Sequence, residues 1–212
     1  MNRYKRAFSM LGSYETDRLI LRRIEKKDLS DLHELCSDRN VTRWLLWSEH
    51  KSREYTRGFI EAVLRGYKDL TYFEYAIVYK ENMKVIGTCG FAVIDEENSS
   101  AELGYVVSPA YSGMGIATEA SFVMLGIAFE ELGLSRVYAR YMTENKASGR
   151  VMEKLGMTYE GLQRRELFVK GEFRDIIHYS ILKNEYFESD ARLLYGIRSM
   201  GDKKKSFFGF WL

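Results

Sequence analysis

The sequence of 212 residues predicts an α+β domain built on a twisted, mixed and mostly antiparallel sheet. Segments with strand-like and helical periodicity follow one another in the order β-α-α-βββ-α-β-α-ββ, which amounts to about seven strands and about four helices. Three strand-like segments in succession indicate an antiparallel meander, and a helix between two strands provides the crossover that a parallel pair needs. Hydrophobic residues make up 46% of the chain, so one core of ordinary size is expected.

The first part of the chain is predicted to form one strand and two helices. The strand covers residues 18–22, an apolar run with charged ends. Apolar side chains at helical spacing follow over residues 29–36, and Asp28 stands where it would cap this helix. Residues 38–50 have no steady period, and we expect a loop or short helix beside the core. A second amphipathic helix is predicted over residues 52–64.

The remaining elements are predicted from the same periodicities. Three strands separated by polar, turn-forming stretches are expected at residues 72–79, 84–94 and 101–107. They are followed by a helix with apolar residues from Phe122 to Leu132, a strand over 136–142, a short helix that ends at Gly156, and a closing hairpin over 158–168 and 173–182. We expect a right-handed crossover through the first of these helices, which makes its flanking strands the parallel pair of the sheet.

Charge and cysteine content exclude several classes of function. The net charge of +2, from 32 basic and 30 acidic residues, creates no basic field for non-specific nucleic-acid binding, so nucleic acid is not expected as a partner. No apolar run reaches the roughly 18 residues of a membrane-spanning helix. Cys36 and Cys89 lie far apart in sequence and match no metal-ligand spacing, which indicates a reduced, cytoplasmic protein without a metal site.

We divide the chain into an N-terminal leader segment over residues 1–14, one domain over 15–188 and a C-terminal extension over 189–212. The apolar stretch of the leader is shorter than the roughly 7–15 residues that a signal peptide needs. The extension ends, over residues 203–212, in lysines followed by aromatic residues, a composition that suits an anionic membrane surface. Aromatic tails more often pack on their own domain or on a second subunit. Membrane contact is therefore not expected, and a homodimer is left open.

The most informative stretch is the glycine-rich turn between the third middle strand and the following helix. Gly113 and Gly115 flank the predicted start of the helix, where glycine permits a sharp turn that exposes successive N–H groups. Together with the helix dipole, these groups form an anion site suited to a pyrophosphate, although an ordinary glycine-containing turn is the alternative. The stretch lacks the Gly-Lys-Ser/Thr of a P-loop and the third glycine of a dinucleotide fingerprint. Nucleotide hydrolysis is therefore disfavoured.

This turn resembles the acetyl-CoA pyrophosphate loop of the GNAT acyltransferase superfamily, whose pattern is Gln/Arg-x-x-Gly-x-Gly/Ala. Here the pattern is occupied by Ser112-Gly113-Met114-Gly115-Ile116-Ala117, with serine in place of the glutamine or arginine. Further stretches resemble the RimJ and RimL branch, which acetylates the N-termini of ribosomal proteins: 15–22, 101–105, 145–148, 153–157 and 160–161. The resemblance covers residues 15–185 and implies the GNAT fold.

The resemblance also implies acetyl-CoA as cosubstrate and assigns the residues that would bind it. The pyrophosphate would contact the turn formed by Ser112, Gly113, Met114, Gly115, Ile116, Ala117 and Thr118. Backbone groups of Val106, Val107 and Ser108 would pair with the pantetheine amides like an added strand, and the Val107 amide would also face the oxyanion. Asn145 would hold the pantetheine arm through its side-chain amide, or would simply cap the helix that follows it.

The candidate catalytic residues follow from the chemistry of amine acetylation. An amine must lose a proton before it attacks a thioester, and Glu102 is the first candidate for the base, with a salt-bridge partner or a solvated strand residue as the alternative reading. Glu166 is the second candidate, by resemblance to RimL-type enzymes. The family's usual tyrosine acid is replaced by Met152, so the resemblance points to Ser148 as the proton donor to sulfur, with a residue that caps its own helix as the alternative.

The acceptor is the least determined part of this prediction. Trp44 and Trp47 are expected to wall a pocket for a narrow primary amine or a peptide N-terminus, and a protein or peptide N-terminal amine is our first candidate. His33 and His50 are expected to be polar surface residues. The alternatives are an acetyltransferase for a small amine, such as a polyamine, an antibiotic or an amino-acid derivative, and a CoA-binding module that has lost catalysis.

Overall fold

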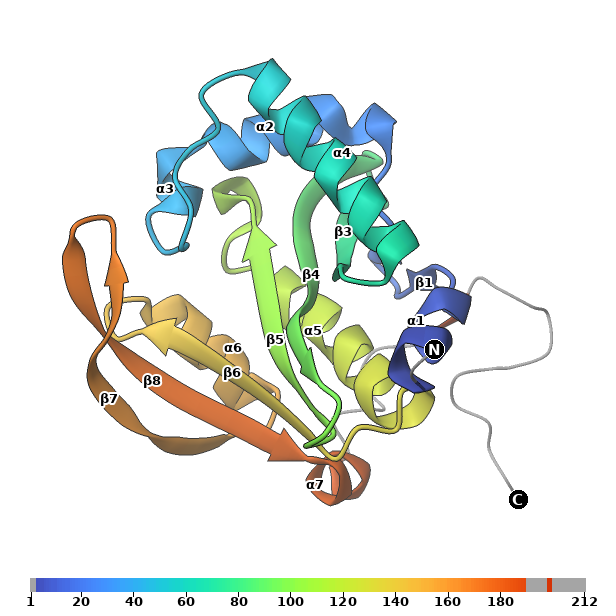
Figure 1. The fold of residues 1–212 in the computed structure, drawn as a ribbon, viewed down its shortest axis with the longest axis vertical. Coiled ribbons are helices and arrows are strands. Elements are labelled where there is room, and N and C mark those ends of the chain that lie inside the picture. Colours follow the sequence, from blue (N-terminus) through green and yellow to red (C-terminus); the bar gives the residue numbers. More distant parts are fainter. Residues whose placement is uncertain (1–2, 190–197, 200–212) are drawn as a thin grey trace.

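One twisted sheet runs through the computed structural model, which describes residues 3–189 and 198–199 (Figure 1). Its strands are β1 (Tyr14–Glu15), β2 (Leu19–Arg22), β3 (Phe73–Tyr79), β4 (Lys84–Asp95), β5 (Ser100–Val107), β6 (Arg136–Met142), β7 (Thr158–Val169), β8 (Glu172–Leu182) and β9 (Arg198–Ser199). The helices are α1 (Arg3–Met10), α2 (Leu29–Ser37), α3 (Arg39–Thr42), α4 (Arg53–Asp69), α5 (Ile116–Gly126), α6 (Lys146–Lys154) and α7 (Lys183–Glu188).

The predicted α+β class and element order are confirmed. The order β-α-α-βββ-α-β-α-ββ appears as β2, α2, α4, β3 to β5, α5, β6, α6, β7 and β8. The sequence analysis did not predict α1, α7 or the two-residue strands β1 and β9. The unsteady segment 38–50 contains α3, a single turn of helix. The prediction for the tail 203–212 lies outside the described residues.

Helix α1 falls within the segment that we predicted as a leader. Its Phe8 is 1% exposed, and the ring stands edge-on to Phe73 of β3 with 4.8 Å between the centroids. Tyr4 of the same helix donates to, or accepts from, the Ser99 hydroxyl at 2.7 Å. The helix therefore packs on the sheet, and the boundary at residue 14 stays a prediction.

The strands pair in the order β7-β8-β6-β5-β4-β3-β2-β1-β9. All neighbours are antiparallel except β5 and β6, which α5 connects by the expected crossover. These two strands pair only where Ser100–Glu102 meets Arg136–Tyr138. Beyond Glu102 the two strands diverge, which leaves a V-shaped gap in the middle of the sheet (Figure 1). The backbone on this side of β5 is consequently open to a ligand.

Side chains of β3 alternate between two helical layers. Tyr75 and Ile77 join the core cluster that includes buried residues of α5 and α6. Ala76 and Val78 join the cluster formed with α2 and α4. Because alternation is strict along a strand, the face toward α2 and α4 is also that of Glu74. The cavity described below lies on this face.

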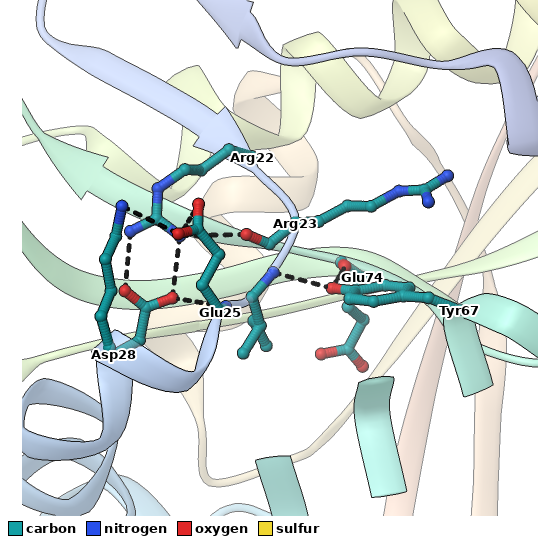
Figure 2. Close-up of polar contacts among 8 residues, drawn as sticks. Arg22, Arg23, Glu25, Asp28, Tyr67 and Glu74 are labelled. Atoms are coloured by element: carbon teal, nitrogen blue, oxygen red, sulfur yellow. Dashed lines mark hydrogen bonds and ion pairs between the residues drawn. The ribbon is translucent and has the colours of Figure 1, made fainter. Parts of the chain in front are cut away.

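Asp28 does not cap α2 as the sequence suggested. Its carboxylate accepts two hydrogen bonds from the Arg22 guanidinium at 2.7 and 2.8 Å, and one from the Glu25 N–H at 2.8 Å (Figure 2). Asp28 stands at the N-cap position of α2 but makes no side-chain cap bond. A buried carboxylate gains more from a bidentate arginine than from a single backbone N–H, which explains the difference. The contact fixes the end of β2 to the start of α2.

Candidate active site

The glycine-rich turn takes the conformation that its sequence predicts. A short 3₁₀ turn, Pro109–Tyr111, follows β5, and Gly113 and Gly115 have φ angles of 77° and 78°. L side chains rarely adopt these angles, so both positions favour glycine. Helix α5 begins directly after Gly115, and its first-turn N–H groups have no partners within the helix. The turn therefore presents backbone donors and a helix N-terminus, which together suit a phosphate.

Arg18 ties this turn to the start of β2, a contact that the sequence analysis missed. Its Nη1 donates to the Met114 carbonyl at 2.9 Å, and its Nε donates to Glu119 Oε2 at 2.8 Å. Glu119 is 2% exposed and also accepts from the Thr16 hydroxyl. The ion pair holds α5, the turn and β2 in one arrangement. Arg18 and Glu119 are 101 positions apart in the sequence, so local sequence patterns could not predict their contact.

The open edge of β5 offers one set of backbone groups to the gap. Ser108 donates its N–H to the Ile86 carbonyl at 2.8 Å, and its own carbonyl accepts from the Tyr111 N–H at 2.9 Å. Backbone groups of successive residues point to opposite sides of a strand, so the Val107 N–H faces the gap and that of Val106 faces β4. Val106, Val107 and Ser108 were predicted to pair with pantetheine. Of these three, Val107 is therefore the residue whose backbone N–H faces the gap.

A cavity of about 860 Å³ extends from beneath α2 and α4, across β5, to the start of α6. Six predicted site residues line it: Trp44, Trp47, Glu102, Val106, Asn145 and Ser148. The turn residues 112–118, together with Val107, Ser108 and Glu166, lie outside this lining. The structure thus brings Glu102 and Ser148 together with Trp44 and Trp47 at one cavity, while the predicted catalytic residue Glu166 lies outside its lining and the predicted phosphate contacts lie at the N-terminus of α5.

Glu102 lies on the cavity wall with an arginine beside it. Arg140 donates from Nε to Glu102 Oε1 at 2.8 Å and from Nη1 to Glu166 Oε1 at 2.9 Å. His178 Nε2 lies 2.6 Å from the other oxygen of Glu166. The salt-bridge reading of Glu102 is therefore correct, and it does not exclude a role as base. Glu166 does not line the cavity, but it accepts a hydrogen bond from Arg140, which does.

Ser148 has a partner that the sequence analysis missed. The Tyr105 hydroxyl lies 2.9 Å from Ser148 Oγ and donates to the Ser148 carbonyl at 3.0 Å. Both residues line the cavity, and burial raises the pKa of Tyr105, which keeps its hydroxyl protonated. Met152, at the position of the family's usual tyrosine, is 1% exposed. Tyrosine in an apolar strand was the available signal, but it is equally typical of core packing.

Asn145 caps α6, as one of its two sequence readings expected. Its Oδ1 accepts from the Ser148 N–H at 3.4 Å. The cap uses the amide oxygen, and the residue also lines the cavity. A contact between its Nδ2 amide and pantetheine stays a prediction.

The acceptor side of the cavity carries aromatic rings. Trp47 is 39% exposed and its ring lies 5.4 Å from that of His50, which also contacts Tyr55 and Phe59. His50 is 7% exposed, so the expectation of a surface histidine was wrong. Burial lowers the pKa of His50, with a smaller effect from the nearby His33. The neutral imidazole of His50 therefore packs among these aromatic rings as part of the cavity wall.

Glu74 is a half-buried acidic residue of the cavity that was not singled out from the sequence. It lies at the start of β3, and the Tyr72 hydroxyl donates to its Oε2 at 3.1 Å. Thr88 provides a second hydroxyl contact, and burial raises the pKa of the Glu74 carboxyl. A glutamate in an otherwise apolar strand was the signal in the sequence. A role for Glu74 in the cavity could be inferred only once the face of the sheet that carries its side chain was known.

Within residues 3–189 and 198–199, no three His, Cys, Asp or Glu side chains cluster as a metal site would require. In the same part of the chain, no helix has the length and apolar character to cross a membrane.

The fold and the site are those of an acetyltransferase: a glycine turn with the geometry to hold a phosphate, an open strand edge and a cavity lie at a break in the sheet. Residues 18–158 match the family described as the acetyltransferase (GNAT) domain. The chain therefore belongs to the GNAT acetyltransferase family, whose members transfer an acetyl group from acetyl-CoA to an amine acceptor. The predictions of fold family and of N-acetyltransferase activity are confirmed.

Three curated relatives illustrate the range of names within this similarity. The "Uncharacterized N-acetyltransferase p20" of Bacillus licheniformis is 34% identical and covers 81% of this chain and 96% of its own. The "Putative ribosomal N-acetyltransferase YdaF" of Bacillus subtilis is 32% identical, with 80% and 94% covered. Spermidine N(1)-acetyltransferase of Escherichia coli is 28% identical, with 78% and 87% covered.

Solved structures agree on the fold. A GNAT-family acetyltransferase from Bacillus anthracis superposes with a TM-score of 0.72 and 30% identity, over 81% of this chain and 99% of that one. The described part of this chain thus shares the architecture of the family.

Proposed function

We propose that the chain acetylates a primary amine by direct attack of the amine nitrogen on the thioester of acetyl-CoA. The observation that carries this proposal is the meeting of the cavity and the gap between β5 and β6 at Glu102. A thioester in the gap and an amine in the cavity would meet beside that carboxylate. Proximity of two bound reactants supplies much of the rate in such transfers.

Binding of the cosubstrate rests mainly on the backbone. The pyrophosphate would lie on the turn 112–118, where two positive-φ glycines precede the N-terminus of α5. The pantetheine arm would follow the open edge of β5, with the Val107 N–H directed toward it and the Asn145 amide at the far side of the gap. The backbone N–H and carbonyl of Ser108 are already bonded within the protein, so Ser108 would help to hold the strand end in place and would not contact pantetheine through its backbone.

The chemistry needs one base and one proton donor. Glu102 takes the proton of the ammonium ion, directly or through a water, and the nitrogen then forms a bond to the thioester carbon. The Val107 N–H stabilises the oxyanion, and the carbon–sulfur bond breaks as nitrogen loses its second proton to water. The sulfur receives a proton from the Ser148 hydroxyl, which Tyr105 positions and which regains its proton from water. The products are the N-acetyl amine, the CoA thiol and one proton.

Two classes of acceptor are compatible with this site. The RimJ/RimL resemblance, and a relative whose name refers to ribosomal N-acetylation, support a protein or peptide N-terminal amine. A relative named for spermidine, and a second carboxylate inside the cavity at Glu74, support a small amine. The cytoplasmic location stays a prediction, supported by the two buried free cysteines.

The test is release of CoA thiol from acetyl-CoA against a mixture of small amines and peptides, combined with calorimetric binding of acetyl-CoA. Glu102→Gln removes the base and preserves size, so turnover should fall by roughly 10²–10⁴ while acetyl-CoA affinity is kept. The loss should shrink as pH rises, because more of the acceptor is already deprotonated. Glu166→Gln serves as the matched variant, since it removes the other carboxylate on Arg140.

Each outcome assigns the site differently. If Glu166→Gln gives the base-like loss and Glu102→Gln does not, the base lies on β7. If wild type binds acetyl-CoA and releases no thiol with any amine, the chain is a CoA-binding module and the proposed activity is wrong.

A further inference from the structure

Glu74 lies in a straight row with two glycines that lead toward the reaction centre. On the sheet, Glu74 is paired with Gly90, and Gly90 is paired with Gly104. A Cβ on Gly90 would stand 2.7 Å from Glu74 Cγ, so the row shares the face on which the Glu74 side chain lies. Two strand spacings separate Glu74 from Gly104, or about 10 Å between Cα atoms.

The two glycines leave the floor of the cavity open. A Cβ on Gly104 would meet no atom within 4 Å, so there is free space above this residue. Gly104 lines the cavity, and Glu102 lies two residues along the same strand on the same face. An extended alkyl chain therefore has room to lie along the backbone between the Glu74 carboxylate and the reacting amine.

The Glu74 carboxylate has no cation beside it in the described part of the chain. Its contacts are the hydroxyls of Tyr72 and Thr88. Figure 2 shows it directed away from Arg22 and Arg23. Among the described arginines and lysines, only Arg140 lines the cavity, and it is bonded to Glu102 and Glu166.

The other titratable groups around Glu74 do not supply a positive charge. Cys36 on α2 and Cys89 on β4 both have their pKa raised to about 12 by burial, with a further contribution from Glu74. Burial also raises the pKa of Tyr67 and Tyr72. An enclosed carboxylate with only neutral neighbours is unfavourable by itself and becomes favourable when a cation binds to it.

We propose that Glu74 is the specificity residue of the acceptor pocket, and that its carboxylate binds a second ammonium group of the acceptor. This inference rests on the proposed N-acetyltransferase function and names its acceptor class. The acceptor is an aliphatic diamine whose nitrogens are separated by about three to five carbon atoms, which fits the space left by two strand spacings. One amine reacts beside Glu102, and the other is held by Glu74.

The walls of the cavity suit the same ligand. Tyr72, Phe59 and Trp44 line it from the side of α4 and the segment after α3. Aromatic faces attract ammonium groups and pack on methylene chains. A half-buried carboxylate beside aromatic walls favours a ligand that carries a positive charge at a fixed distance from the reacting amine.

The experiment compares kcat/KM for butylamine, 1,4-diaminobutane and a tripeptide N-terminal amine. Wild type should prefer the diamine over butylamine by about 10- to 100-fold, the usual range for a charged hydrogen bond. Glu74→Gln should abolish this preference by raising KM for the diamine. The control is Glu61→Gln, an exposed glutamate of α4, which removes one negative charge away from the cavity and should keep the preference.

A second variant keeps the inference falsifiable if Glu74→Gln does not fold. Glu74→Asp retains the charge on a shorter side chain, so the preferred diamine should lengthen by one carbon. Equal kcat/KM of wild type for butylamine and diaminobutane, or a tripeptide preference that Glu74→Gln leaves intact, would overturn the assignment of Glu74 while acetyl transfer itself stands. If wild type acetylates none of the three amines, the result contradicts the proposed N-acetyltransferase function itself and not only the assignment of Glu74.

Discussion

The glycine turn before α5 and the cavity beneath α2 and α4 present different parts of the chain to a ligand. The turn presents backbone N–H groups of consecutive residues, held by two glycines with φ near 77°. The cavity presents side chains from β3 to β8 and from α2, α4 and α6. A turn of this kind binds any ligand that carries a suitable phosphate, whereas the cavity can be changed residue by residue. Under the proposed function, cosubstrate binding would therefore depend on the backbone and the choice of acceptor on side chains.

The two regions also differ in how they treat charge. At the turn, Arg18 and Glu119 neutralise each other at 2.8 Å, so the anion site depends on backbone dipoles. In the cavity, Glu102 has Arg140 beside it while Glu74 has only hydroxyls. Changes in backbone conformation should therefore affect the first region, and changes in side-chain shape or charge the second.

The largest effect is expected at Gly115. Gly115→Val places a β-branched residue at a φ of 78° and fills the space beside Arg18 Nη2, which lies 3.7 Å from the position of the new Cβ. CoA affinity should fall by at least about 100-fold, because the backbone donors would no longer converge on a phosphate. Isothermal titration calorimetry with CoA measures the loss.

Gly171→Val is the matched control for this variant. Gly171 has a φ of 87° in the turn between β7 and β8, and a Cβ there would meet nothing within 4 Å. It carries the same backbone strain outside the site and should keep wild-type CoA affinity. Retained CoA binding by folded Gly115→Val would show that the turn does not hold the phosphates.

A smaller effect, on amine binding and not on CoA binding, is expected at Gly104. The methyl group of Gly104→Ala fits the protein without a clash but occupies the floor of the cavity. KM for the amine should rise roughly 10-fold, as expected for obstruction of a close-packed contact, while CoA affinity and the melting temperature change little. Unchanged amine KM in steady-state kinetics would mean that the acceptor does not pass over this glycine.

The smallest effect concerns pH and the wall of the cavity. The pKa of His50 is lowered below 6.5 by burial, so the folded protein keeps the imidazole neutral where the unfolded chain protonates it. Below pH 6.5 the unfolded state then binds more protons, and the free energy of unfolding should fall as pH decreases. Urea unfolding at several pH values should show a flatter profile for His50→Gln. Parallel profiles would assign the acid sensitivity to other groups.

Much of the fold was predictable because periodicity reports the burial of each face. Residues 18–22 and 29–36 were recognised as a strand and a helix from their apolar spacing alone. The capping role given to Asp28 was wrong, because Arg22 competes for the same carboxylate through a contact that only the folded chain makes. His50 was misplaced for the same reason, since its burial depends on rings from α4.

The sequence by itself determined the glycine turn that we propose as the cosubstrate site. Residues 112–118 are contiguous, and the groups that matter there are backbone N–H donors whose geometry two glycines already imply. Tertiary structure alone decided the acceptor half. Glu74 and Gly104 meet across β4 only in the observed pairing, and a shift of one residue would turn Glu74 to the opposite face of the sheet. Strand register is a property of the folded chain, so these residues form one site only after the sheet has assembled.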